Sequence, residues 1–175
     1  MPIRILLLED VPTDAELVED ELRQAGLTFL TRRVTTQEAF VRELREFRPD
    51  VVLSDHNLPQ FDGRAALQLA KQIAPTVPFI LITGSLSEET AVEYMKTGAA
   101  DYVLKDRLAR LGPAVLGALE ERRVREEKER AETARQQAEE ALRRNQEFLR
   151  QVIDANPNLI FVKDWDGRFT MVNRA

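Results

Sequence analysis

The stretch Val51-Val52-Leu53-Ser54-Asp55 decides the fold, because it is a short apolar run that ends in a carboxylate. Such runs are typical of buried parallel strands, and sheets of this kind bind ligands at the carboxyl ends of their strands. Three further runs also end in polar groups, namely residues 3–8 before Glu9 and Asp10, residues 79–82 before Thr83, and residues 102–104 before Lys105. We therefore expect these polar side chains to meet in one pocket.

Helical patterns alternate with these runs, and residues 28–34 read as one more strand. The helix signals are Pro12-Thr13-Asp14 with a stop at Gly26, a capping box of Thr35 and Glu38, a segment over about 64–74, and a capping box of Ser85 and Glu88 with a stop at Gly98. Strands that alternate with helices predict an α/β fold. We expect a doubly wound five-stranded parallel sheet of the flavodoxin type.

The composition excludes several classes of protein. The chain has 175 residues, 43% of them hydrophobic, which suffices for one full core and an extension. Residues 1–119 carry 13 Lys and Arg against 18 Asp and Glu, so no basic patch predicts a nucleic-acid partner. No apolar stretch approaches the roughly 20 residues that span a bilayer, and the absence of cysteine suits a reducing compartment. We expect a cytoplasmic protein without a membrane partner.

The C-terminal third differs in character, because neither Gly nor Pro interrupts residues 118–156. A heptad places Val124, Ala131, Ala138, Asn145 and Val152 at one core position, and Glu127, Ala134, Ala141 and Phe148 at the other. This pattern predicts a long helix from Pro113, whose first turns (Val115, Leu116 and Leu119) close the core, followed by a helical coiled-coil linker over 120–153. A single solvated helix with many ion pairs is the alternative. Asp166-Gly167 between apolar residues predicts a short β-hairpin tail.

The chemistry of the predicted pocket follows from its charges. Three carboxylates, Glu9, Asp10 and Asp55, repel one another unless a hard cation lies between them, and Mg²⁺ prefers such oxygen ligands. Asp55 would be both a metal ligand and a nucleophile. With Lys105 neutralising phosphoryl oxygens and the Thr83 hydroxyl donating to one of them, the carboxylate could hold a phosphoryl group as an acyl phosphate.

Because of these polar groups at the strand ends, residues 1–119 resemble the receiver domain of two-component response regulators. The family's acidic pair matches Glu9 and Asp10, and its phosphoacceptor aspartate matches Asp55. Its hydroxyl and aromatic switch residues match Thr83 and Tyr102, and its lysine matches Lys105. Pro59 and Gly63 also lie at the family's spacing. The resemblance implies phosphoryl transfer to Asp55 with Mg²⁺, with the backbone carbonyl of Asn57 as a further metal ligand. It implies a cognate histidine kinase or phosphotransfer protein as partner. Beyond self-catalysed phosphoryl acceptance and autodephosphorylation, it implies no enzyme activity.

The resemblance has one departure and one continuation. The family often has proline after the lysine, whereas Asp106 follows Lys105 here and predicts a short helical turn before Gly112-Pro113. Residues 154–175 resemble the start of a PAS sensor domain, with Asn156-Pro157 and Asp166-Gly167 at matching places. The length and heptad of the helix predict a parallel homodimer that relays the receiver's change onward. The order of receiver, helix and PAS segment implies a downstream output of the histidine-kinase or diguanylate-cyclase type.

The sequence favours three other functions less. A haloacid-dehalogenase-type phosphatase also uses a strand-end aspartate and Mg²⁺, but it needs an aspartate where Asn57 stands. A receiver-like module used only for dimerisation would have no reason to keep Asp55, Thr83 and Lys105 together. A flavodoxin-like FMN site is disfavoured because residues 10–13 lack glycine and include an acid. His56, the only histidine, is expected to face water rather than to act in catalysis.

Overall fold

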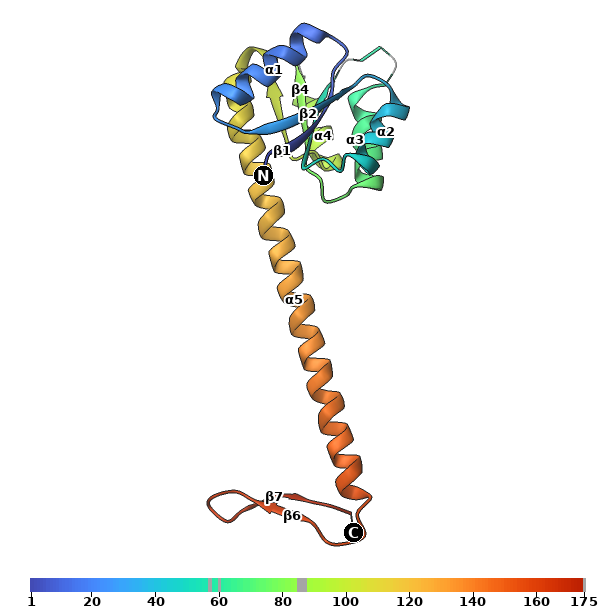
Figure 1. Cartoon of the computed structure of the whole chain (residues 1–175), viewed down its shortest axis with the longest axis vertical. Coiled ribbons are helices and arrows are strands. Elements are labelled where there is room, and N and C mark those ends of the chain that lie inside the picture. The colour runs from blue at the N-terminus through green and yellow to red at the C-terminus, as the bar shows by residue number, and fades with distance from the viewer. Residues whose placement is uncertain (57, 60, 85–87, 175) are drawn as a thin grey trace. The chain divides into compact units, whose positions relative to one another are not determined.

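The computed structural model describes residues 1–56, 58–59, 61–84 and 88–174 (Figure 1). The chain forms two compact units, Met1–Arg125 and Glu126–Ala175. The domain boundaries expected from the sequence, at residues 119 and 153, stay predictions. Among the described residues, no helix combines the length and the apolar character needed to cross a bilayer.

The first unit is a five-stranded parallel sheet in the order β2-β1-β3-β4-β5, as predicted (Figure 1). Its strands are β1 (Ile3–Leu8), β2 (Phe29–Val34), β3 (Val51–Asp55), β4 (Phe79–Thr83) and β5 (Asp101–Leu104). Its helices are α1 (Pro12–Gln24), α2 (Gln37–Glu46), α3 (Gly63–Ile73), α4 (Glu88–Thr97), the 3₁₀ helix η1 (Lys105–Arg110) and the first turns of α5 (Leu111–Asp154). The predicted α/β fold is therefore confirmed.

Both faces of the sheet are covered, because side chains alternate along each strand. Ile5 and Leu7 of β1 pack in a core with residues of α1 and α5, whereas Leu6 and Leu8 pack in a core with residues of α2, α3 and α4. All four side chains are essentially buried, and burying one such side chain fully stabilises a fold by about 1.5–3 kcal/mol. The two cores hold β1 and β3 side by side, so their carboxyl ends meet at one edge.

Two helix starts differ from, or add to, the predictions. The cap of α2 is Thr36, not Thr35, because the extended backbone of Thr36 lets its hydroxyl accept the Ala39 N–H at 3.3 Å. The cap of α3 is Asp62, whose Oδ1 accepts the Ala65 N–H at 2.7 Å. Ser85, the cap expected for α4, lies outside the described residues.

The end of the first unit also differs in detail. A short helical turn does follow β5, but Gly112 and Pro113 lie inside the first turn of α5 rather than before it. Proline is tolerated there because the first N–H groups of a helix have no partner within it. A Cβ on Gly112 would lie 2.3 Å from the Ala25 Cβ, so only glycine allows α5 to pack this close. Of the residues expected to close the core, Val115 is buried and Leu119 partly buried, but Leu116 is 51% exposed because it lies on the other side of the helix.

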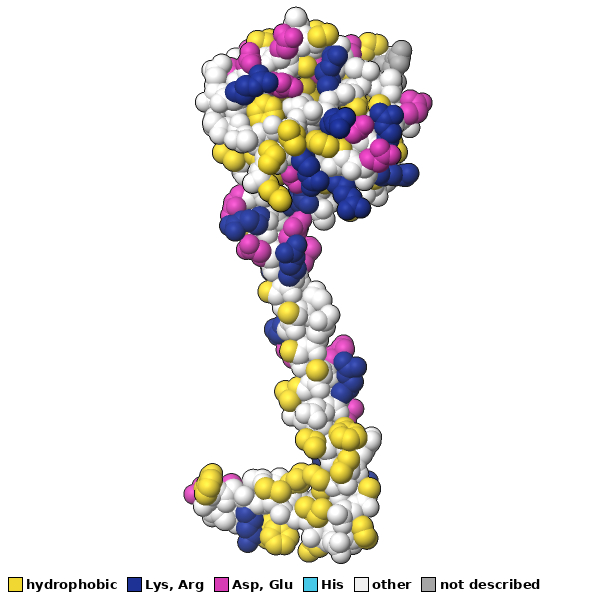
Figure 2. Space-filling view, viewed as in Figure 1, with side chains coloured by type: hydrophobic (Ala, Val, Ile, Leu, Met, Phe, Trp, Pro, Cys, Tyr) yellow, Lys and Arg dark blue, Asp and Glu magenta, His cyan; other side chains and the backbone are white. Residues whose placement is uncertain are grey.

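The second unit contains the rest of α5 and a hairpin of β6 (Phe161–Lys163) and β7 (Phe169–Val172), which are antiparallel as predicted. The Asn173 side chain joins the two parts: its Nδ2 donates to the carbonyls of Ile153, Asn156 and Asn158, and its Oδ1 accepts the Ile160 N–H. Ion pairs line the helix surface, for example Arg135 with Glu132 and Glu139. Apolar side chains nevertheless lie at the surface of this unit (Figure 2).

Candidate functional site

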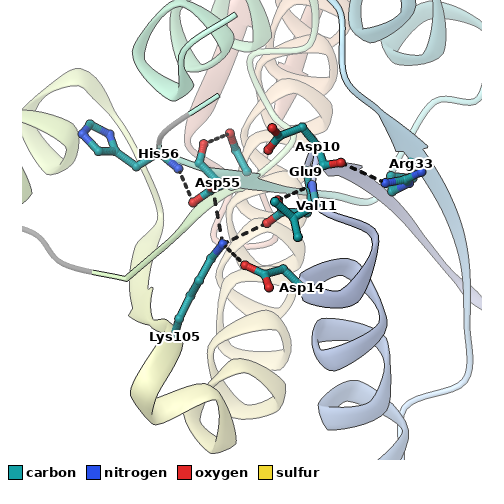
Figure 3. A network of polar contacts seen from close by, with 9 residues as sticks. Glu9, Asp10, Val11, Asp14, Arg33, Asp55, His56 and Lys105 are labelled. Atoms are coloured by element: carbon teal, nitrogen blue, oxygen red, sulfur yellow. Dashed lines mark hydrogen bonds and ion pairs between the residues drawn. The ribbon is translucent and has the colours of Figure 1, made fainter. Parts of the chain in front are cut away.

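Three of the predicted ligands come together at the carboxyl edge of the sheet (Figure 3). One carboxylate oxygen from each of Glu9, Asp10 and Asp55 lies within 4.8 Å of the other two. Glu9 and Asp10 follow β1, Asp55 ends β3, and the pairing of Leu8 with Ser54 places these ends side by side. Glu9 is 1% exposed and Asp55 7% exposed, while Asp10 is partly buried. The group could hold a metal ion.

Backbone donors orient two of these carboxylates. The Val11 N–H donates to Glu9 Oε1 at 3.0 Å, and the His56 N–H donates to Asp55 Oδ1 at 2.8 Å. Burial raises the pKa of Glu9, although the Val11 N–H and Lys105 oppose this rise. Burial thus makes an ionised Glu9 unfavourable even with Lys105 beside it, and clustered carboxylate oxygens are ligands that suit Mg²⁺.

The Lys105 ammonium group lies among the acids (Figure 3). Its Nζ is 2.5 Å from Asp14 Oδ2, 3.1 Å from Glu9 Oε2 and 3.5 Å from Asp55 Oδ2. Burial by itself would lower the pKa of Lys105, but the hydrogen bonds with Asp14 and Glu9 and the charge of Asp55 raise it overall. Lys105 is thus a protonated cation within reach of the predicted nucleophile.

Asp14 is a member of this group that the sequence analysis missed. In the sequence Asp14 indicates only the start of a helix, where acidic residues are common because they interact favourably with the helix dipole. The available signal was its spacing. Asp14 comes four residues after Asp10, in the first turn of a helix that begins at the edge of the site, so its side chain can reach the same pocket.

Thr83 and Tyr102 lie on the strands that complete this edge. Thr83 follows Ile82, which pairs with Asp55, and itself pairs with Leu104, the residue before Lys105. The Thr83 side chain is fully buried. Tyr102 is partly buried and lies beside a surface depression with Ala91, Val92, Met95 and Lys96 of α4. Their roles as switch residues remain predictions.

The two residues after Asp55, His56 and Asn57, also concern the predicted site. Asn57, the source of the predicted carbonyl ligand, lies outside the described residues. His56 does not simply face water, because its ring is partly buried and its Nδ1 lies 2.8 Å from the Tyr94 hydroxyl oxygen. The expectation for this side chain was wrong because Tyr94, 38 positions later, could not be placed beside it from the sequence.

The sequence model of the response regulator receiver domain matches residues 5–115. This chain belongs to that family. It is 36% identical over 110 residues to the response regulator protein FleR of Pseudomonas aeruginosa, and 34% identical over 103 residues to the transcriptional regulatory protein ZraR of Escherichia coli. These matches cover 63% and 59% of this chain but only 23% of either relative. The family membership therefore describes the receiver unit and not a whole regulator.

Solved receiver structures are similar to the first unit. NtrX from Brucella abortus superposes with a TM-score of 0.67 at 28% identity, covering 75% of this chain and 30% of that one. A receiver domain protein from Clostridium thermocellum superposes with a TM-score of 0.62 at 25% identity, covering 70% of this chain and 98% of that one. A protein-glutamate methylesterase of Archaeoglobus fulgidus is 34% identical over 106 residues, but that match covers only its receiver domain. Receiver domains are not enzymes by themselves.

Proposed function

We propose that this protein is a phosphoacceptor module of a two-component system and that Asp55 takes the phosphoryl group. One observation carries the proposal: a protonated Lys105 lies 3.5 Å from Asp55, which is one of three clustered carboxylates. A carboxylate that is buried with a cation at this distance can attack a phosphorus atom while the cation balances the charge of the phosphoryl oxygens.

The transfer has a simple balance. One oxygen of the Asp55 carboxylate forms a bond to phosphorus, and the bond between phosphorus and its donor breaks. With acetyl phosphate as donor, acetate leaves; with a histidine kinase or phosphotransfer protein as donor, the imidazole nitrogen leaves. Thr83 and Lys105 would each bind a phosphoryl oxygen. Asp14 would release Lys105 for this contact, since an ammonium group shared among several carboxylates can exchange one partner for another.

The same carboxylates suit a resident metal ion. Glu9, Asp10 and Asp55, together with the backbone carbonyl of Asn57, would hold Mg²⁺. When bound, the ion would offset the charge of the carboxylates and of the incoming phosphoryl oxygens. The support on this chain is the donor set itself: three clustered carboxylate oxygens, one of them from Glu9, whose burial raises its pKa even with Lys105 beside it.

The response to phosphorylation would pass through Thr83 and Tyr102. A phosphoryl group adds about −1.5 to −2 charges and strong hydrogen-bond acceptors, so it would draw the Thr83 hydroxyl toward Asp55. The Tyr102 ring would then turn inward into the space that Thr83 leaves. The supporting observation is the strand pairing, which places Thr83 on β4, the strand next to β3, and Tyr102 on β5, the strand that pairs with β4.

The helix would carry this change onward. We propose residues 1–119 as the receiver, 120–153 as a coiled-coil linker of a parallel homodimer, and 154–175 as the opening of a PAS domain in a cytoplasmic signalling protein. The exposed apolar side chains Phe148, Leu149 and Val152 of α5 support an interface with a second chain. The relay would be a change in the register or crossing of the paired helices.

Phosphotransfer is tested by incubating the chain with acetyl phosphate and measuring its intact mass. The wild type should gain one phosphoryl group only when Mg²⁺ is present, and Asp55→Asn should gain none. Asp20→Asn is the matched control, because Asp20 is an exposed aspartate of α1 that pairs only with Arg23 among the described contacts. Equal labelling of Asp55→Asn and the wild type would exclude Asp55 as the acceptor.

A further inference from the structure

Tyr94 of α4 is a tyrosine whose hydroxyl lies inside the fold. Its side chain is 2% exposed and belongs to the core on the α2, α3 and α4 face. The hydroxyl oxygen lies 2.8 Å from His56 Nδ1, and the two rings meet edge to face with centroids 5.5 Å apart at 77°. A buried hydroxyl is unfavourable without a hydrogen-bond partner, and His56 provides that partner. The hydrogen bond therefore explains why this buried position has a tyrosine rather than a phenylalanine.

His56 in turn holds the predicted acceptor. Its backbone N–H donates to Asp55 Oδ1 at 2.8 Å and also lies 3.2 Å from the carbonyl oxygen of Ile82 on β4. The same N–H is therefore shared between the carboxylate and the neighbouring strand. Any change in the strength of the carboxylate as an acceptor alters this balance and so the position of His56.

The start of α3 leaves room for this contact. A Cβ on Gly63 would lie 2.8 Å from the backbone oxygen of Asp55 and 3.2 Å from the Tyr94 hydroxyl oxygen. A larger residue would push the hydroxyl or the end of β3 away. The end of β3, the start of α3 and Tyr94 within α4 thus converge around one hydroxyl group.

We propose that the His56–Tyr94 hydrogen bond positions α4 according to the state of the Asp55 carboxylate, as a link separate from Thr83 and Tyr102. This inference rests on the proposed phosphoacceptor role of Asp55. An ionised carboxylate oxygen accepts a hydrogen bond more strongly than either oxygen of an acyl phosphate linkage. Once a phosphoryl group is bonded to Asp55, the His56 N–H loses its stronger acceptor and moves toward the Ile82 carbonyl. The imidazole moves with its backbone, and the hydroxyl of Tyr94 follows it.

In this scheme His56 and Tyr94 are positioning residues. Neither needs to touch the phosphoryl group, so their loss should leave Asp55 able to accept it. What changes is the response of α4. A purely structural bond would behave differently, because its loss would lower stability and leave the response of α4 to the site intact.

Hydrogen exchange of α4 in the full chain separates these two roles. The probes are Mg²⁺ with beryllofluoride, which mimics the phosphoryl group, and acetyl phosphate for labelling. We expect beryllofluoride to change the exchange of the α4 amides in the wild type. We expect this change to fall to less than half in Tyr94→Phe and in His56→Leu, and to fall no further in the double variant. Labelling by acetyl phosphate should persist in all three.

Thr97→Ala is the matched control. It also removes a hydroxyl from α4, but one whose hydrogen bond goes to Glu93 of the same helix, so the response should stay at the wild-type level. A full α4 response in Tyr94→Phe, additive losses in the double variant, or no α4 response in the wild type would each overturn the inference while leaving the labelling of Asp55 in place. A wild type that is not labelled at all overturns the proposed function and this inference together.

Discussion

The two units of the chain differ in how far they bury their apolar side chains. The first unit buries them on both faces of its sheet and places its charges at one edge, where Glu9, Asp55 and Lys105 meet. The second unit leaves Phe161, Phe169 and many others more than half exposed, and Trp165 fully exposed (Figure 2). A two-stranded hairpin is marginal in water, whereas a covered five-stranded sheet is not. The first unit therefore has its own core, and the second has a surface suited to a partner.

The largest expected effect tests whether the two units differ in stability. Leu53→Ala removes a fully buried side chain from the centre of the sheet and should lower the free energy of unfolding by about 2–5 kcal/mol. Phe169→Ala truncates a larger side chain that is 62% exposed, and should cost about 1 kcal/mol or less. Urea unfolding followed by circular dichroism gives both values. Similar losses would mean that the hairpin is packed as tightly as the sheet.

A second variant tests what holds the hairpin to the end of α5. Asn173→Ala removes one acceptor and the two N–H donors that three carbonyls share, and at roughly 1 kcal/mol for each of these groups it should destabilise the second unit by about 2–3 kcal/mol. Hydrogen exchange of the Ile160 and Asn173 amides reports this unit, because the Ile160 N–H donates to Asn173 Oδ1 and the Asn173 N–H to the Ile160 carbonyl. Asn158→Ala, with an exposed side chain, is the control. Unchanged exchange of the Asn173 amide in Asn173→Ala, now measured at the alanine, would show that another contact fixes the hairpin.

The buried tyrosine makes the first unit sensitive to alkali. Burial, with the charge of Asp62 next, raises the pKa of Tyr94 to about 12 from its usual 10. The folded state therefore keeps a proton that the unfolded state loses above pH 10, so this stabilising contribution is full below pH 10 and is lost as the pH rises through 12. The loss should reach about 2–3 kcal/mol. Unfolding of the wild type and of Tyr94→Phe across this range measures it, and equal pH slopes would contradict it.

Metal binding should stabilise the first unit alone. Mg²⁺ at ten times its dissociation constant should raise the free energy of unfolding by about 1.4 kcal/mol, because it binds only the folded site. Asp10→Asn removes one of the three carboxylates and should reduce this gain, whereas Asp106→Asn, outside the group, should not. Thermal unfolding with and without a chelator provides the measurement. The same gain in Asp10→Asn would place the cation elsewhere.

The smallest expected effect concerns the helix seam. Its Ala-rich core positions bury little area, so we expect the chain to form a weak homodimer. Ala138→Glu should weaken association by placing charges in the seam, whereas Asn145→Leu should strengthen it and loosen its register. Gln136→Glu, on the opposite side of the helix, is the control. Sedimentation over a concentration series tests this, and a monomer throughout would make α5 a spacer.

Elements whose sequence signal is local could be predicted. A strand such as residues 51–55 is recognisable from its own apolar run and from the polar residue that ends it. The sheet and the convergence of Glu9, Asp10 and Asp55 could therefore be predicted. The predicted cap of α2 was wrong by one residue, because Thr35 and Thr36 have the same side chain and only the backbone decides which one caps the helix. The prediction that Leu116 closes the core was also wrong, since the sheet-facing side of α5 depends on where the helix begins.

The sequence by itself determined the class of the fold, the polar group at its edge, the long helix and the hairpin, because apolar period, turn residues and charge are properties of neighbouring positions. Only the tertiary structure decided that Asp14 meets Lys105, that His56 meets Tyr94, and that Gly112 meets Ala25. These partners are 38 to 91 positions apart. Contacts at such separations depend on how strands and helices pack, and the packing is set by the two cores as a whole rather than by the residues that meet.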